Sequence, residues 1–158
     1  MKKVGHTPPP APRGINLRAL LYVEDNDDNW RVAQLRLASK FELVRASTDK
    51  EACTQLRDHG ARFVAILMDI ELQGSLLNGI DLARIARGKA TERPLPDFAG
   101  GIAPIDAPII FMTAYGDVYS EAALVAAGGD RVLTKPIDFK VLNMALMNLY
   151  VNRSVASS

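Results

Sequence analysis

Five side chains with reactive or charged groups stand at the ends of four short apolar runs. They are Glu24 and Asp25 after residues 19–23, Asp69 at the end of residues 63–69, Thr113 at the end of residues 107–113, and Lys135 at the end of residues 131–135. The carboxyl ends of parallel strands share one edge of a sheet, where open α/β sheets bind ligands. The pattern therefore predicts that three carboxylates, a hydroxyl and an ammonium group meet in one cleft.

Clustered carboxylates repel one another, so a cleft that holds several of them needs a compensating cation. Oxygen ligands without histidine or cysteine favour a hard ion, most simply Mg²⁺, which commonly partners phosphate. Lys135 and Thr113 suit the oxygens of a phosphoryl group, as a point charge and a hydroxyl donor. Asp69 is then the candidate nucleophile that forms an aspartyl phosphate.

The elements that position these residues alternate in type along the chain. We expect strands at 19–23, 41–46, 63–69, 107–113 and 131–135, and helices at 28–39, 48–60, 78–88, 118–129 and 138–152. This alternation is typical of an α/β fold, a parallel sheet wrapped by helices. The third and fourth strands are continuously apolar, which predicts that helices cover both of their faces.

Local signals mark the element ends and the domain limits. Thr48 with Glu51 resembles a capping box, and Gly60 stands where a left-handed residue would close that helix. Residues 87–107 contain three prolines and three glycines without periodicity, which predicts a long inserted loop. We expect a flexible N-terminal tail at 1–16, one domain at 17–151, and a frayed C-terminus at 152–158.

Composition excludes several functional classes. The 19 basic and 18 acidic residues are well mixed, with a net charge of +1, so we expect no direct contact with nucleic acid. The single cysteine, Cys53, leaves no disulfide pair and no cysteine pair for zinc. No apolar stretch approaches the length of a membrane span, and no signal peptide is evident. We therefore expect a cytoplasmic protein that does not contact membranes.

Four short motifs resemble one family, the receiver domains of two-component response regulators. They are YVEDN at 22–26, LMDIEL at 67–72, FMTAYG at 111–116 and LTKP at 133–136, in the family's order at four successive strand ends. The resemblance covers roughly residues 19–150. It implies a flavodoxin-like, doubly wound five-stranded parallel sheet in the order 2-1-3-4-5, with five helices.

The resemblance also implies a role for each matched residue. Asp69 would be the phosphoacceptor and a Mg²⁺ ligand, with Asp25 as a direct ligand and Glu24 acting directly or through water. The backbone carbonyl of Glu71 would complete the protein's share of the metal coordination. Thr113 and Lys135 would hold the phosphoryl group, and the peptide bond between Lys135 and Pro136 would be cis.

The chain departs from the family pattern at the rim of the site. Gln73 stands near the usual place of a proline, and Ser75 and Leu76 lengthen the turn before Gly79. The loop 87–107 is also longer than usual. Because it joins the third helix to the amino end of the fourth strand, we expect it to lie away from the cleft, as a contact surface or tolerated slack rather than part of the chemistry.

The position that usually carries the switch aromatic holds Val132, three residues before Lys135. Readout through the fourth helix and fifth strand is therefore in question even if phosphorylation is intact. Tyr115 is placed either to substitute in part or to screen the phosphoryl group from water. Glu71, two residues after the acceptor, is the other side chain placed to affect that water.

The favoured function is a single-domain response regulator rather than a turnover enzyme. A sensor histidine kinase or a phosphotransfer protein would donate the phosphoryl group to Asp69, and slow autodephosphorylation would remove it. The signal would pass to an unidentified protein or along a phosphorelay. The fourth helix, fifth strand and fifth helix form the face on which we expect partners or a second copy.

Two other functions stay open from sequence. Val132 keeps alive a phosphorylation-independent pseudo-receiver that acts as an interaction module. A phosphatase with an aspartyl nucleophile, of the haloacid dehalogenase type, is disfavoured because Glu71 stands where that family has a second aspartate, and the chain shows no cap domain.

Overall fold

The structure, a computed structural model, describes residues 17–156. The expected tail at 1–16 lies outside the described residues, as do residues 157 and 158. The strands are β1 (Arg18–Val23), β2 (Phe41–Ala46), β3 (Phe63–Asp69), β4 (Ile109–Thr113) and β5 (Arg131–Thr134). The α-helices are α1 (Asp27–Leu37), α2 (Asp49–His59), α3 (Gly79–Ala86), α4 (Glu121–Ala126) and α5 (Phe139–Ala156), with short 3₁₀ turns η1 (Gly60–Arg62) and η2 (Asp97–Ala99).

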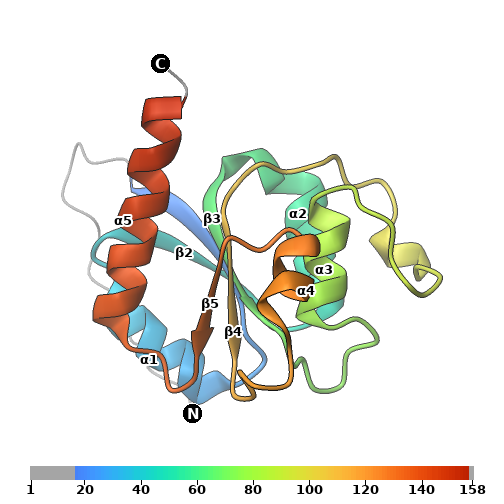
Figure 1. Cartoon of the computed structure of the whole chain (residues 1–158), viewed down its shortest axis with the longest axis horizontal. Coiled ribbons are helices and arrows are strands. Elements are labelled where there is room, and N and C mark those ends of the chain that lie inside the picture. The colour runs from blue at the N-terminus through green and yellow to red at the C-terminus, as the bar shows by residue number, and fades with distance from the viewer. Residues whose placement is uncertain (1–16, 157–158) are drawn as a thin grey trace, which may run out of the picture.

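All five strands are parallel and follow the order β2-β1-β3-β4-β5, which confirms the predicted fold class. α1 and α5 cover one face of the sheet, and α2, α3 and α4 cover the other (Figure 1). Every residue of β4 is buried, and β3 is buried except at Val64. Helices on both faces of these two strands explain their continuously apolar sequence.

The hydrophobic core has two parts, one on each face of the sheet. On the side of α1 and α5, buried Leu20, Leu67 and Ile110 pack with residues of these two helices. On the side of α2, α3 and α4, the buried residues of the sheet include Ile66, Met68 and Phe111. Successive side chains of a strand point to opposite faces, so the same strands supply both parts. The two layers hold the strands, and therefore their carboxyl ends, in fixed positions.

Gly60 does not end α2 in the way its sequence position suggested. Its φ is −54°, in the right-handed region, and the chain continues into η1. The prediction of a left-handed terminator at Gly60 was therefore wrong. A Cβ at Gly60 would lie 2.6 Å from Cδ1 of Ile105. The glycine lets the Ile105 side chain of the inserted loop approach closely, and its left-handed conformational freedom is not used.

The last two helices differ from their predicted limits. α4 begins only at Glu121, because the Ser120 side chain caps it by accepting a hydrogen bond from the Ala123 amide. Residues 117–119 therefore belong to the loop after β4. α5 continues to Ala156, four residues beyond the expected end at 152. No glycine or proline interrupts residues 139–156 to stop it.

The inserted loop 87–107 starts and ends at the amino end of β4, as expected, but its middle runs along α2 and α3. The Arg57 guanidinium in α2 donates hydrogen bonds to the carbonyls of Phe98 and Gly100. Arg93 pairs with Asp81 in the first turn of α3, at 3.2 Å. The loop therefore extends toward the carboxyl edge of the sheet. The sequence had predicted only a position at the amino edge.

No helix within residues 17–156 is long and apolar enough to cross a membrane.

Candidate functional site at the carboxyl edge of the sheet

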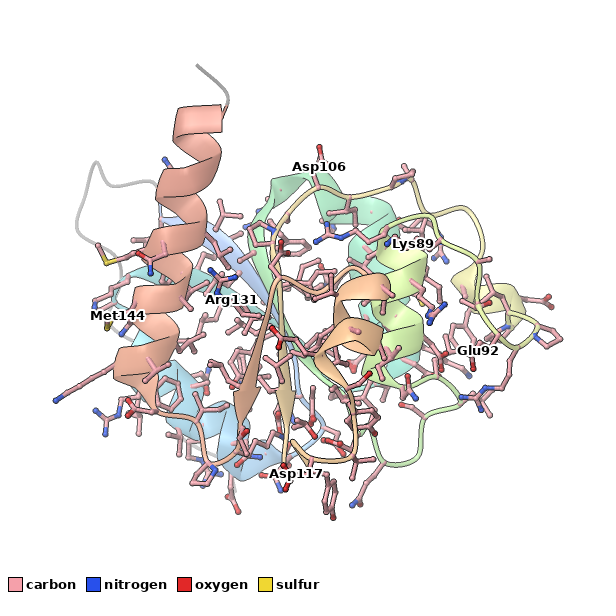
Figure 2. The ribbon with its side chains drawn as sticks, viewed as in Figure 1. Lys89, Glu92, Asp106, Asp117, Arg131 and Met144 are labelled. Carbon is pink, nitrogen blue, oxygen red and sulfur yellow. The ribbon has the colours of Figure 1, made fainter. Side chains whose placement is uncertain are left out.

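The parallel register brings the predicted residues to one edge of the sheet. Tyr22 of β1 pairs with Leu67 of β3, and Asp69 of β3 pairs with Met112 of β4. In the side-chain view, Asp117 lies beyond the carboxyl ends of β4 and β5, and Asp106 lies at the opposite end of the molecule (Figure 2). The residues at the ends of β1, β3 and β4 therefore lie together at the carboxyl edge of the sheet.

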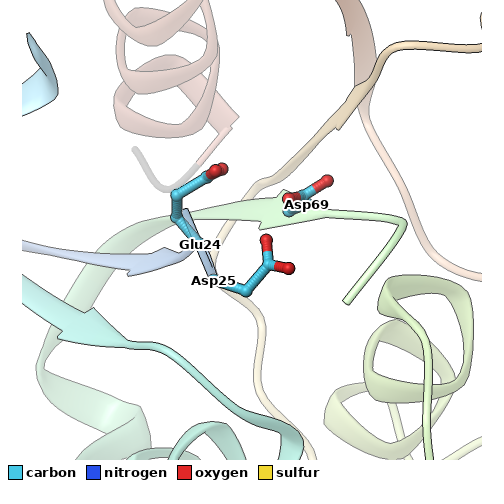
Figure 3. A group of neighbouring side chains, drawn as sticks. All are labelled: Glu24, Asp25 and Asp69. Atoms are coloured by element: carbon cyan, nitrogen blue, oxygen red, sulfur yellow. The ribbon is translucent and has the colours of Figure 1, made fainter. Parts of the chain in front are cut away.

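Glu24, Asp25 and Asp69 form the acidic cluster of this site. Each offers a carboxylate oxygen that lies within 4.8 Å of the others, and the three side chains meet at the ends of β1 and β3 (Figure 3). Glu24 and Asp69 are buried, whereas Asp25 is half-buried. The cluster is therefore open to solvent mainly on the side of Asp25.

Lys135 balances part of this negative charge. Its ammonium group lies 2.9 Å from Oδ2 of Asp69 and 3.2 Å from Oε2 of Glu24. Burial by itself would lower the pKa of Lys135, but the hydrogen bonds and charges of Asp69 and Glu24 raise it. The ammonium group is thus held charged beside the candidate phosphoacceptor. The peptide bond between Lys135 and Pro136 is cis, as the family resemblance implied.

Burial has the opposite consequence for the acceptor itself. It raises the pKa of Asp69 to about 7, and the charges of Glu24 and Asp25 act in the same direction. The Lys135 ammonium opposes this shift. Oδ1 of Asp69 is buried and has no hydrogen-bond partner among residues 17–156. A buried carboxylate oxygen without a donor is costly, so the site lacks one positive partner for Asp69.

A hard divalent cation fits this donor set. The three side chains supply only carboxylate oxygens, the ligands that Mg²⁺ prefers, and the unpartnered oxygen of Asp69 belongs to the cluster. Lys135 neutralises one charge, which leaves a net negative cluster for a metal ion to balance.

Thr113 lies fully buried at the end of β4, but its hydroxyl does not face Asp69 as a donor. It donates a 2.6 Å hydrogen bond to Oε1 of Glu71 and accepts one from the Tyr115 amide at 3.0 Å. The structure thus brings Glu24, Asp25 and Asp69 together, with Lys135 bound to Glu24 and Asp69, and connects Thr113 to the rim residue Glu71 instead.

The turn after β3, residues 70–78, is held in place by buried side chains and hydrogen bonds. Leu72 and Leu77 are buried, and Gly74 turns the chain with φ +75°. Gly79 closes the turn: its amide donates to the Ile70 carbonyl at 2.8 Å, and a Cβ there would lie 2.2 Å from the Asp69 carbonyl oxygen. The two extra residues of the turn are therefore accommodated at a defined place.

Asp49, the first residue of α2, holds this turn. Its buried carboxylate accepts hydrogen bonds from the amides of Leu76 and Leu77, at 2.9 and 3.1 Å. Its own amide donates to the Ser75 hydroxyl at 3.2 Å. At the other end of the turn, the Gln73 amide donates to Oδ2 of Asp25 at 3.0 Å. The turn thus connects the start of α2 to the acidic cluster.

The other predicted modulating positions are on the surface. Val132 in β5 is 36% exposed, and Tyr115 in the loop after β4 is 60% exposed. The Tyr115 hydroxyl has no hydrogen bond among the described residues.

Sequence reasoning missed two contributors to the site. The amide group of Asn29, in the first turn of α1, donates to Oε1 of Glu24 at 2.8 Å. Tyr119, half-buried in the loop after β4, interacts with the Glu71 carboxylate. The signal for Asn29 was its place one helical turn after the acidic pair. Nothing in the sequence distinguished Tyr119 from Tyr115.

Comparison with solved structures shows that the chain is similar to receiver domains. A protein assigned as a response regulator from Chloroflexus aurantiacus is 27% identical and has a TM-score of 0.64, covering 85% of this chain and 98% of that one. The receiver domain of a sensor histidine kinase from Pseudomonas aeruginosa, solved with a magnesium ion coordinated in its active-site cleft, is 24% identical with a TM-score of 0.65. Its alignment covers 85% of this chain and 98% of that one.

A CheY-like receiver domain protein from Methanospirillum hungatei shares the fold with a TM-score of 0.68 at 20% identity, over 88% of this chain and 98% of that one. Among curated proteins, hybrid signal transduction histidine kinase M from Dictyostelium discoideum is 27% identical over 135 residues. That match covers 85% of this chain but only 5% of the kinase. No protein-family model matches the chain. The structural neighbours are response regulator receiver domains, which confirms the resemblance drawn from the four motifs.

Proposed function

We propose that the chain is a Mg²⁺-dependent phosphoacceptor of the receiver type, with Asp69 as the residue that is modified. The observation that carries this proposal is the surroundings of Asp69: one oxygen lies 2.9 Å from the Lys135 ammonium, and the other is buried beside two further carboxylates with no hydrogen-bond partner among the described residues. A structural aspartate would have its buried oxygens paired. These surroundings suit a group that gains its partners from a metal ion and a phosphoryl group.

The chemistry is a phosphoryl transfer. An oxygen of the ionised Asp69 forms a bond to phosphorus, while the bond from phosphorus to the donor's nitrogen or oxygen breaks and its electron pair leaves with the donor. Lys135 stabilises the oxygens of the transferred group by charge, and Thr113 can donate a hydrogen bond to one of them. Glu24, Asp25, Asp69 and the carbonyl of Glu71 would hold a Mg²⁺ ion, which would supply charge neutralisation.

The proposed partners follow from this chemistry. A sensor histidine kinase or a phosphotransfer protein supplies the phosphoryl group, and a protein target reads the modified state or passes the group along a relay. The chain would catalyse its own modification and a slow autodephosphorylation, without turnover of a separate substrate. The face of α4, β5 and α5 is the proposed contact surface, and Val125, Val132, Val141 and Met144 are exposed apolar residues on it.

Acetyl phosphate tests the proposal without knowledge of the kinase. We expect incubation with Mg²⁺ and acetyl phosphate to add the mass of one phosphoryl group, measured on the intact protein. Asp69→Asn should abolish this gain because it removes the nucleophile. Asp117→Asn, at an exposed aspartate of the loop after β4, is the matched control and should be phosphorylated normally.

One observation favours a second function, a pseudo-receiver that binds partners without phosphorylation. Val132 cannot act as an aromatic switch, and it lies on the exposed edge strand of the sheet. If the wild-type protein gains no phosphoryl group and binds no beryllofluoride, the phosphoacceptor proposal fails and this second function remains.

A further inference from the structure

The hydroxyl group of Thr113 is already occupied in the unmodified protein. It has a single hydrogen to donate. That hydrogen bonds to Oε1 of Glu71, at an oxygen distance of 2.6 Å, which is typical of a hydroxyl donating to an ionised carboxylate. Thr113 is fully buried, so water reaches this bond only from the side of Glu71, which is half-buried. Thr113 therefore cannot donate to a phosphoryl group on Asp69 until Glu71 releases it.

The same carboxylate also engages the loop that follows β4. Tyr119 lies half-buried in this loop and packs against the core on the side of α2, α3 and α4. Burial and the nearby charge of Glu71 raise the pKa of the Tyr119 phenol, so this phenol lies in the field of the Glu71 carboxylate. The Tyr115 amide, in the same loop, donates to the Thr113 hydroxyl. Glu71 thus connects the turn after β3 to the loop that leads into α4.

An unfilled cleft lies beside Tyr119. It lies between α4 and β5 and has a volume of about 640 Å³, whereas a larger cleft at the opposite edge of the sheet measures about 1050 Å³. Tyr119, Val132 and Thr134 are among the residues that line the smaller cleft. Its volume lies within the roughly 300–1,000 Å³ of pockets that hold whole small molecules, so it can accept one phenol ring. Val132 contributes only a short side chain to it.

We propose that Glu71 is a latch of the unmodified state, and that the ring of Tyr119, which lines the cleft between α4 and β5, moves further into that cleft when the latch opens. This inference rests on the proposed phosphorylation of Asp69. A phosphoryl group adds about 1.5 to 2 negative charges, two residues from Glu71 in the chain. Its oxygens compete for the Thr113 hydrogen, and its charge repels the Glu71 carboxylate. Both effects release Thr113 and Tyr119 together.

The latch makes Glu71 a positioning residue that opposes modification. Beryllofluoride, a stable mimic of the phosphoryl group, measures this opposition at saturating Mg²⁺. A hydrogen bond to a charged group contributes about 1.5–3 kcal/mol, so Glu71→Ala should bind beryllofluoride about tenfold more tightly than the wild type or better. Glu71→Gln keeps an acceptor without the charge and should give a smaller gain. Asp117→Asn, which removes a charge from the same rim, should leave the affinity unchanged.

The readout through Tyr119 is measured by hydrogen exchange of residues 114–126. Beryllofluoride should change exchange in this segment of the wild type. In Tyr119→Phe, which loses the phenol hydroxyl but keeps the ring, the unmodified segment should already exchange faster, and the response to beryllofluoride should persist. In Tyr119→Ala the response should be lost. Tyr115→Phe is the matched control and should behave as the wild type.

The outcomes separate the latch from the proposed function. If the wild type itself takes up neither a phosphoryl group nor beryllofluoride, the phosphoacceptor function fails. If the wild type binds beryllofluoride but Glu71→Ala and Glu71→Gln bind it no more tightly, the latch is wrong. An unchanged exchange response in Tyr119→Ala would exclude Tyr119 as the moving residue. Thermal unfolding of each variant checks that it is folded, and Glu71→Gln, which preserves the size of the side chain, serves if Glu71→Ala is not.

Discussion

The charge state of Asp69 couples its burial to metal binding. Burial raises the pKa of this carboxyl group to about 7, from 3.8 for an ordinary aspartate. Lys135 reduces the shift but does not cancel it. A phosphoacceptor has to be ionised to attack phosphorus and to bind a cation. In the metal-free site, the pKa of Asp69 therefore lies close to neutral pH. Near this pH the side chain changes between the protonated form, which cannot attack phosphorus, and the ionised form, which can.

This raised pKa predicts how stability depends on pH in the absence of Mg²⁺. Between about pH 4 and 7 the folded state keeps a proton on Asp69 that the unfolded state has lost. The stabilisation that comes from this bound proton is fully present below about pH 4 and is lost as pH approaches 7. The free energy of unfolding should therefore fall as pH rises through this window. Asp69→Asn should lack this contribution. Urea unfolding of both proteins from pH 4 to 8 measures the difference, and parallel curves would contradict it.

The affinity for Mg²⁺ should also depend on the protonation of Asp69, but it should rise with pH where the stability falls. A cation competes with the proton for the Asp69 carboxylate, so binding should tighten as pH rises toward and past about 7. Isothermal titration calorimetry at pH 6, 7 and 8 measures this trend. Asp25→Asn, which removes one proposed ligand, should weaken binding at every pH. An affinity that does not change with pH would show that Asp69 does not hold the ion.

At the scale of elements, the turn after β3 is supported by a neighbouring helix. The Asp49 carboxylate is only 4% exposed and accepts from the amides of Leu76 and Leu77, while Ser75 accepts from the Asp49 amide. Ser75 and Leu76 are the residues that lengthen this turn. The residues that lengthen the turn are thus the ones that bond to Asp49. The other end of the turn contacts Asp25 through the Gln73 amide.

We expect Asp49→Ala to destabilise the protein by about 3 kcal/mol, because it leaves the buried amide of Leu77 and the partly buried amide of Leu76 without acceptors. It should also speed hydrogen exchange across residues 72–78. Asp49→Asn keeps an acceptor oxygen and should cost less. Asp58→Ala, at an exposed position of the same helix, is the matched control and should stay within about 0.5 kcal/mol of the wild type. Equal stabilities for the variants at 49 and 58 would refute this account of the turn.

At the scale of the whole molecule, Arg87 connects segments that are distant in the sequence. From the end of α3 it donates to the carbonyls of Gly128 and Ile105 and pairs with Asp130 at 3.1 Å. These contacts join the end of the inserted loop, the end of α4 and the start of β5. The Arg87 side chain is 15% exposed, so solvent screens the pair with Asp130 only in part.

Arg87→Met should therefore destabilise the molecule by about 2–4 kcal/mol, because two carbonyls and one carboxylate lose their charged donor. Arg84→Met removes a single long hydrogen bond of 3.4 Å and should cost less than about 1 kcal/mol. Urea unfolding monitored by the fluorescence of Trp30, the single tryptophan, measures both. A loss no larger at position 87 than at position 84 would mean that these contacts do not stabilise the fold.

The sequence alone determined the fold class and most of the acidic site. Apolar runs and helical periods specify a parallel α/β sheet, and residues at strand ends must meet at one edge whatever their partners are. Glu24, Asp25, Asp69 and Lys135 were placed correctly for this reason. The course of loop 87–107 and the right-handed backbone at Gly60 depend on contacts with distant residues, so local patterns could not predict them. The start of α4 differs from these, because the Ser120 side chain that sets it is a local cap.

Only the tertiary structure decided which side chains act on one another. Two residues at the same sheet edge can bond to different partners, and the choice depends on side-chain directions to within a few tenths of an ångström. Thr113 was expected to face the phosphoryl group, yet its hydroxyl is held by Glu71. Tyr119 and Asp49 had no signal of their own in the sequence, because their roles arise where separate loops and helices meet.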